Sequence, residues 1–132
     1  MIYTNSDGGA RGNPGPGAIG VLVRREENIL EMHSEKIGSV TNNVAEYKAL
    51  IKALEIAMKH TKDEVTCVMD SELIVKQLLG EYQVRNSELL KLFREVQKLQ
   101  ENFSKVKYIH VSRWNKFQQM VDSLLNMELD KR

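Results

Sequence analysis

Ten residues near the N-terminus, Gly8 to Gly17, concentrate most of the residues in this chain that interrupt regular structure. They hold five of the eight glycines and both prolines. Glycine and proline at this density predict a loop. The residues before it, 2–6, are β-prone and end at Asp7, so we expect the chain to open with a short strand that leads into a glycine-rich loop.

Apolar residues beyond this loop recur in patterns that predict two further strands and then alternating helices and strands. Strands are expected at 18–24 and 29–37, joined by a turn at 26–28. The later elements are a helix from Asn42 or Asn43 to about 58, a strand at 65–69, a helix at 71–79 capped by Ser71, a helix from Ser87 to about 99, a strand at 105–111 and a helix at 117–129.

The order of these elements, β-β-β-α-β-α-α-β-α, limits the fold. The connection at 26–28 is too short for a crossover, so the first three strands are expected to be antiparallel. A hairpin-built start joined to helical crossovers predicts an α/β fold, with a mixed five-stranded sheet and helices on both of its faces.

Length and composition are those of one globular domain, which we expect to span residues 1–132. Hydrophobic residues make up 42% and charged residues 28% of the chain, so disorder and fibrous repeats are excluded. No apolar run is long enough for a membrane span, and no signal peptide is visible. The single cysteine, Cys67, cannot form an internal disulfide, and we expect a cytoplasmic protein. The formal net charge of +1 argues against tight non-specific binding to nucleic acid.

Four acidic residues occupy unusual positions. Asp7 and Asp70 each end a predicted strand, where ligands of α/β sheets tend to bind. Glu46 and Asp122 each share a helix face with apolar residues. Each of the four also has an ordinary explanation when taken singly. Asp7 fits a turn residue and Asp70 a helix cap, whereas Glu46 fits an acid favoured by the helix dipole and Asp122 an acid on a helix surface. If they converge, they need a strong positive charge to stay ionised, and hard oxygen ligands suit Mg²⁺ or Mn²⁺.

Five motifs accompany these acids, in order and at a characteristic spacing. They are Ser6 to Ala18, Thr41 to Tyr47, Met69 to Leu73, Gly80 to Tyr82 and Val121 to Leu124. Together they resemble the type 1 ribonuclease H family through nearly the whole chain, and the short bacterial and archaeal forms look most similar. The short connection at 80–85 leaves no room for the extra basic helix that some larger members carry.

The resemblance implies the ribonuclease H fold and a metal-dependent endonuclease that cuts the RNA strand of RNA/DNA hybrids, leaving 5′-phosphate and 3′-hydroxyl ends. Asp7, Glu46, Asp70 and Asp122 correspond to the family's catalytic, metal-binding carboxylates. Two Mg²⁺ ions are implied as cofactors, which Mn²⁺ can replace; one activates water and the other stabilises the leaving oxygen. The implied partner is the hybrid duplex, and we expect a monomer with no membrane contact and no obligate protein partner.

The resemblance also implies a set of residues that bind the hybrid. They are Gly8, Asn13, Thr41, Asn42, Asn43, Ser71 and Glu72. Short amides and hydroxyls hydrogen-bond phosphate and sugar without reading base sequence. Asn42 and Asn43 also fit helix capping, and one of them can do both.

Two departures from the family pattern bear on the site. Glu72 stands where relatives often have glutamine, and its charge would weaken binding if it faced the hybrid. The segment before Asp122 is two residues longer than in relatives, so the basic residue near the scissile phosphate is either Arg113 or, closer to the helix start, Lys116. Trp114 either stacks on a nucleotide or packs beside the last helix; we expect the packed position.

Two other functions are compatible with the sequence. One is a hybrid-binding or partner-binding module of the same fold with little catalysis, and the other is a different nuclease of the same superfold, such as a resolvase or an exonuclease. The four acids favour the enzyme over the module. The run from Asp-Gly-Gly to Pro-Gly-Pro-Gly argues against the resolvase and the exonuclease.

Overall fold

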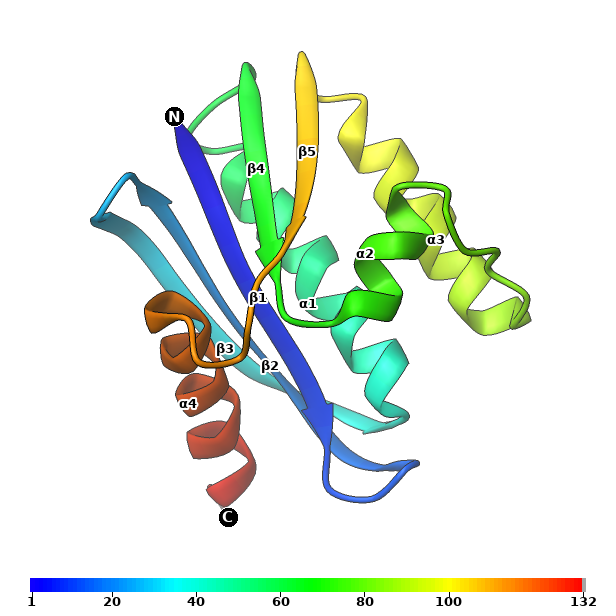
Figure 1. The fold of residues 1–132 in the computed structure, drawn as a ribbon. Helices are drawn as coiled ribbons and strands as arrows, with labels where there is room; N and C mark the ends of the chain where they lie inside the picture. The colour runs from blue at the N-terminus through cyan, green and yellow to red at the C-terminus, as the bar shows by residue number, and fades with distance from the viewer. Residues whose placement is uncertain (132) are drawn as a thin grey trace.

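The structure is a computed structural model that describes residues 1–131. Its elements are β1 (Ile2–Ala10), β2 (Gly15–Arg25), β3 (Asn28–Val40), α1 (Asn42–Ala57), β4 (Glu64–Met69), α2 (Glu72–Leu78), α3 (Ser87–Gln100), β5 (Lys105–His110) and α4 (Lys116–Asp130). The strands form one sheet in the order β3-β2-β1-β4-β5 (Figure 1). β2 is antiparallel to both β1 and β3, whereas β4 is parallel to both β1 and β5. The predicted mixed α/β sheet is therefore confirmed.

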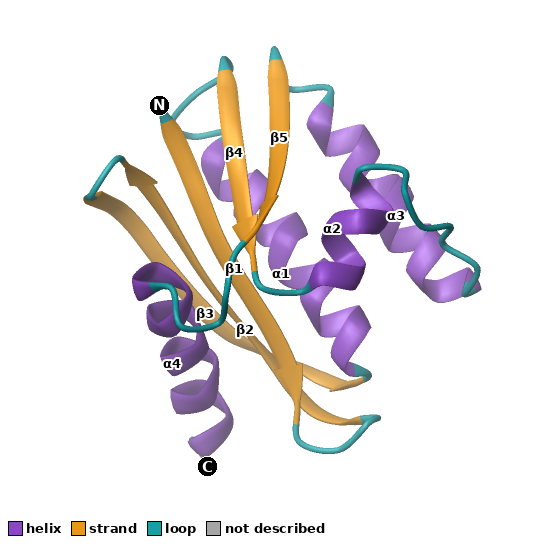
Figure 2. Ribbon diagram, viewed as in Figure 1, coloured by secondary structure: helices purple, strands orange, loops and turns teal. Residues whose placement is uncertain are grey.

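Helices cover both faces of this sheet, as Figure 2 shows. α1 packs on β1 and β2, and α3 packs on α1, whereas α4 lies on the opposite face across β1, β2 and β3. The main hydrophobic core includes the fully buried Leu50 and Leu54 of α1. A smaller cluster of Leu22, Phe117 and Val121 attaches α4 to β2. None of the helices in residues 1–131 has both the length and the apolar character needed to cross a membrane.

The glycine-rich run differs from the prediction, because most of it is strand. β1 continues to Ala10 and β2 begins at Gly15, so only residues 11–14 lie between the strands. Gly8 and Gly9 pair with β2 in regular antiparallel register. A Cβ at Gly8 would overlap the backbone carbonyl of Ala45 in α1. Part of the glycine content therefore reflects a close approach between strand and helix rather than a turn.

Two helix caps also differ from the predictions by one residue. Thr41, rather than Asn42 or Asn43, caps α1, because its hydroxyl accepts a hydrogen bond from a backbone N–H three residues on (3.3 Å). Asn86, rather than Ser87, caps α3 in the same way (3.0 Å). Each stretch offers adjacent residues with capping side chains, so sequence alone does not choose between them.

Gly20 holds β2 close to α4, and this contact predicts an effect on stability. A Cβ at Gly20 would overlap the carbonyl oxygen of Val121, whereas one at Gly9 would meet only Leu125 at 3.6 Å. We expect Gly20→Ala to lower the free energy of unfolding by about 1–3 kcal/mol and Gly9→Ala to change it by less than about 0.5 kcal/mol. Urea unfolding of the two variants measures this difference. Equal stability of the two variants would contradict the packing of α4 on β2.

Candidate active site

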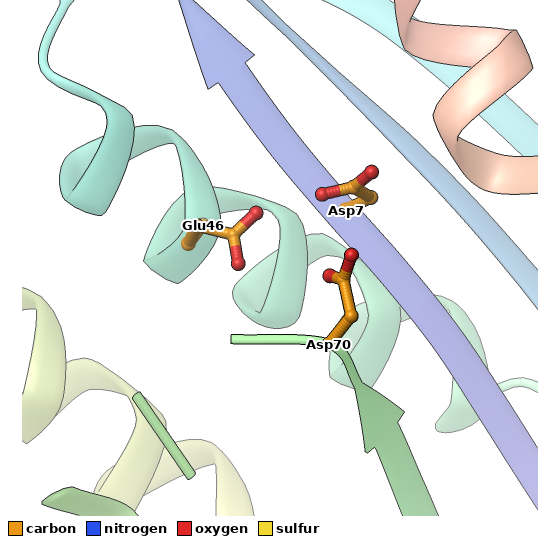
Figure 3. Close-up of side chains that lie close together, drawn as sticks. All are labelled: Asp7, Glu46 and Asp70. Carbon is orange, nitrogen blue, oxygen red and sulfur yellow. The ribbon is translucent and has the colours of Figure 1, made fainter. Parts of the chain in front are cut away.

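Two acidic side chains meet on neighbouring parallel strands. Asp70 directly follows the end of β4, as predicted, whereas Asp7 lies inside β1, which continues to Ala10 rather than ending at Asp7. Asn5 of β1 lies opposite Val68 of β4, so Asp7 and Asp70, each two residues farther along, lie side by side. Glu46 comes from α1 and points toward them (Figure 3). A carboxylate oxygen from each of the three lies within 4.8 Å of the others. The structure thus brings three of the four predicted carboxylates into one cluster.

The position of Glu46 depends on Gly8. Because Gly8 has no side chain, the first turns of α1 pack directly on β1. The N–H of Gly8 donates a hydrogen bond to Oε1 of Glu46 (2.8 Å), which fixes this carboxylate beside Asp7. The resemblance predicts substrate binding for Gly8, and in the structure its N–H is directed at Glu46.

The carboxylate cluster is electrostatically unfavourable without a cation. Burial raises the pKa of Asp7 far above its usual range, and the negative charges of Glu46, Asp70 and Asp122 raise it further. Burial also raises the pKa of Glu46 to about 7, although the hydrogen bond from Gly8 acts in the opposite direction. Carboxylate oxygens at this spacing are hard ligands, which suit Mg²⁺ or Mn²⁺. The donor set therefore fits a divalent metal.

Asp122, the fourth predicted ligand, lies at the rim of the cluster rather than inside it. It is an exposed residue of α4 and is not among the three carboxylates that approach within 4.8 Å. It does line a cleft of about 540 Å³ together with Asp7 and Asp70. Its charge contributes to the raised pKa of Asp7, so Asp122 is close enough to act on the same site.

Sequence reasoning missed Gln118, which contacts the cluster from α4. Gln118 is 1% exposed, and its Nε2 donates to Oδ1 of Asp70 (3.2 Å) and to the backbone carbonyl of Ser6 (3.0 Å). Its Oε1 accepts from Nδ2 of Asn5 (3.0 Å), whose own oxygen accepts from Nε of Arg24 (2.9 Å). This chain of polar groups orients Asp70. The sequence feature that could have revealed it is an amide on the apolar face of the last helix, one turn before the last predicted ligand.

Four of the predicted substrate-binding residues lie together. Asn13, Thr41, Asn42 and Asn43 line one cavity of about 360 Å³. The Asn42 side chain accepts a hydrogen bond from the N–H of Ala10 (2.9 Å), and the Asn42 N–H donates to Oδ1 of Asn13 (2.9 Å). Asn42 therefore ties the β1–β2 loop to α1 and leaves the capping of α1 to Thr41.

Ser71 and Glu72 stand at the start of α2. The hydroxyl of Ser71 caps this helix, as predicted, by accepting from the N–H of Ile74 (3.3 Å). Glu72 is exposed and pairs with Lys76 (2.7 Å), and the hydrogen bond from Lys76 lowers the pKa of Glu72. The negative charge of Glu72 is therefore compensated locally.

The β5–α4 connection places Arg113, and not Lys116, at the cleft. Arg113 and Trp114 both line it. Lys116 pairs instead with Glu27 (3.0 Å) and does not line the cleft, which favours Arg113 as the basic residue near the site. Trp114 is 68% exposed. The expectation that it packs beside the last helix is also wrong, because Phe117 fills the buried position beneath α4.

The raised pKa values predict how the stability of the metal-free protein depends on pH. A carboxyl group with a higher pKa in the folded than in the unfolded state favours folding at low pH, and this contribution is lost as the pH rises through the folded value. The ordinary pKa is 3.8 for Asp7 and 4.5 for Glu46, and folding raises the pKa of Glu46 to about 7. In EDTA we expect the melting temperature to be at least about 3 °C lower at pH 8 than at pH 5.

Two controls accompany this measurement. Mg²⁺ should restore more stability at pH 8 than at pH 5, because protons and metal compete for the same oxygens. Asp7→Asn removes the buried charge, so its melting temperature in EDTA should vary less with pH. A wild-type melting temperature in EDTA that rises from pH 5 to pH 8 would contradict the buried carboxylate cluster.

Comparison with known proteins places the chain in a family. The family model described as "Reverse transcriptase-like" matches residues 5–128. Ribonuclease HI of Halobacterium salinarum is 37% identical over 130 residues, which are 98% of this chain and 64% of the relative. The bifunctional protein Rv2228c of Mycobacterium tuberculosis is 40% identical over 114 residues, 85% of this chain and 31% of the relative. The chain thus spans less than two thirds of the length of each of these relatives.

Solved structures agree with the curated relatives. The N-terminal RNase H domain of Rv2228c from Mycobacterium tuberculosis matches with a TM-score of 0.92 at 37% identity, covering 98% of this chain and 93% of that one. LC11-RNase H1 in complex with an RNA/DNA hybrid matches with a TM-score of 0.91 at 38% identity, covering 98% and 97%. Motifs, sheet topology and carboxylate cluster lead to the same conclusion: the chain belongs to the type 1 ribonuclease H family.

Proposed function

We propose that this chain is a metal-dependent endonuclease that hydrolyses the RNA strand of RNA/DNA hybrids, acting as one domain over residues 1–132. The observation that carries the proposal is the cluster of Asp7, Glu46 and Asp70, in which one oxygen from each residue lies within 4.8 Å of the others beside the carboxyl end of β4. Membership of the ribonuclease H family and similarity to an RNase H1 bound to an RNA/DNA hybrid support it.

In this proposal Asp7, Glu46, Asp70 and Asp122 hold the metal. Two Mg²⁺ ions, or Mn²⁺ in their place, supply an activated water and stabilise charge on the leaving oxygen. Water adds to phosphorus and the bond to the 3′ oxygen breaks, which leaves a 5′-phosphate and a 3′-hydroxyl. The guanidinium of Arg113, at the same cleft, supplies a permanent positive charge next to the phosphate.

The chain orients its carboxylates through groups that are already in place. The N–H of Gly8 holds Glu46, and the amide of Gln118 holds Asp70. Hydrogen bonds of this kind reduce the reorganisation that metal and substrate binding would otherwise require. Catalysis in this proposal therefore depends on Gln118 although it does not touch the substrate.

Recognition of the hybrid is assigned to the cavity of Asn13, Thr41, Asn42 and Asn43. Their amide and hydroxyl groups can hydrogen-bond phosphates and 2′-hydroxyls but form no pattern that reads bases. We therefore expect cleavage to depend on the type of duplex and not on its sequence.

A second candidate function, a hybrid-binding module with weak catalysis, is favoured by the position of Asp122 outside the 4.8 Å cluster.

Cleavage of labelled duplexes tests the proposal. With Mg²⁺ we expect the wild-type protein to cut RNA/DNA hybrids but not DNA/DNA, and to cut nothing in EDTA. Asp70→Asn should reduce cleavage at least about 10³-fold without unfolding the protein, because it removes a metal ligand, whereas Asp122→Asn should cost about 10-fold or more. Asp63→Asn, which alters an exposed acid outside the cleft, is the matched control. Full activity of a folded Asp70→Asn protein would refute the metal mechanism, and hybrid binding without cleavage by the wild type would favour the module.

The contact between Gln118 and Asp70 predicts a separate effect. Gln118→Leu keeps the side chain close to its original size but removes the donor to Asp70, so we expect kcat to fall about 10-fold and the Mg²⁺ concentration for half-maximal rate to rise. Gln97→Leu, at an exposed position of α3, controls for the loss of an amide. If Gln118→Leu lowers only the melting temperature and leaves the Mg²⁺ dependence unchanged, the role of Gln118 is structural.

A further inference from the structure

The connection between β5 and α4 is fixed at both ends next to the carboxylate cluster. At its start, the N–H of Val111 donates to the carbonyl of Met69 at the end of β4 (2.9 Å). At its end, the side chain of Asn115 caps α4, and the N–H of Asn115 donates to the carbonyl of Ser112 (3.0 Å). The N–H of Trp114 donates to Oγ of Ser112 (3.1 Å). The connection is therefore an ordered turn, and its side chains project from a defined backbone.

Trp114 projects from this turn into solvent at the mouth of the cleft. It is the only tryptophan of the chain, and 68% of it is exposed. It lines the same cleft as Asp7, Asp70 and Asp122. Exposure of so large an apolar surface contributes nothing to the core, and such residues gather where a protein binds a partner or ligand.

One face of the Trp114 ring is already occupied. The guanidinium carbon of Arg113 lies 4.8 Å from the ring centroid, in the range of a cation–π contact. The exposed fraction of the side chain leaves the rest of the ring free. The pair therefore presents a positive charge and a flat apolar surface to the same cleft, and a nucleotide carries the complementary groups, an anionic phosphate and an apolar face of sugar and base.

We propose that Trp114 is a substrate-contacting residue, whose free face packs against the sugar and base of a nucleotide next to the phosphate held at the carboxylate cluster. The same ring holds Arg113 at the cleft. This inference rests on the proposed function, since it takes the ligand of the cleft to be an RNA/DNA hybrid. It also assigns a role to the longer segment before Asp122, because this segment places Trp114 beside the site.

Binding of a labelled hybrid in Ca²⁺, an oxygen-liganded ion, tests this contact, with gels to confirm that the hybrid stays intact during the measurement. We expect Trp114→Ala to weaken binding about 10-fold, since loss of an aromatic contact to a nucleotide costs roughly 5- to 150-fold. Trp114→Phe should retain most of the affinity. Tyr82→Ala is the matched control, because Tyr82 is also exposed and also carries a cation, Lys76, over its ring (5.1 Å), yet lies outside the cleft.

The single tryptophan gives a second readout that does not depend on activity. Saturating hybrid should quench its fluorescence and reduce its accessibility to acrylamide at least about two-fold, as expected for a ring that stacks on a nucleotide. If the wild type cuts hybrids in Mg²⁺ but its tryptophan stays fully accessible and Trp114→Ala binds like the wild type, this inference fails and the proposed function stands. If the wild type neither binds nor cuts hybrids, both fail.

Discussion

The cost of burying the carboxylates of Asp7 and Glu46 beside each other and beside Asp70 is the constraint around which this site is built. Burial raises the pKa of Asp7 and of Glu46, and the negative charges of neighbouring carboxylates raise both further. Ionised oxygens within 4.8 Å of one another favour separation of the elements that carry them. The fold resists this through the parallel pairing of β1 with β4 and the close packing of α1 on Gly8. The cluster is thus maintained by the core, and a divalent cation relieves its cost.

α4, which packs on the other face of the sheet, contacts the same cluster. Gly20 lets the helix approach β2 closely, and Gln118 then reaches Asp70. Asp122 lies four residues after Gln118, so the two share one face of the helix. A single helix therefore presents a buried amide that orients one carboxylate and an exposed acid at the rim of the cleft. Movement of α4 would disturb both, so its packing on β2 helps to hold the carboxylate site in place.

The sequence was sufficient for features that hydrophobic periodicity or position in the chain determines. The element order and the mixed sheet follow from the hydrophobic pattern, and the meeting of Asp7 with Asp70 was expected from two acids near the ends of neighbouring strands. The predicted end of the first strand at Asp7 was wrong, because β1 continues to Ala10. The glycine-rich run was not predictable in the same way, because glycine marks close packing as well as turns, as Gly8 demonstrates. Gln118 was missed because a single amide on an apolar face is a weak signal. The position of Trp114 was predicted wrongly because its exposure depends on Phe117 taking the buried position.

Calorimetric titration of the metal-free protein with Mg²⁺ at pH 7, in two buffers of different ionisation enthalpy, tests the central claim most directly. If the cluster keeps protons in the absence of metal, Mg²⁺ must displace them, and we predict the release of about one proton per chain. Asp7→Asn should abolish most of this release. Binding heats that are the same in both buffers would show that the carboxylates are already ionised, and would contradict the account of a cluster that keeps protons until a cation replaces them.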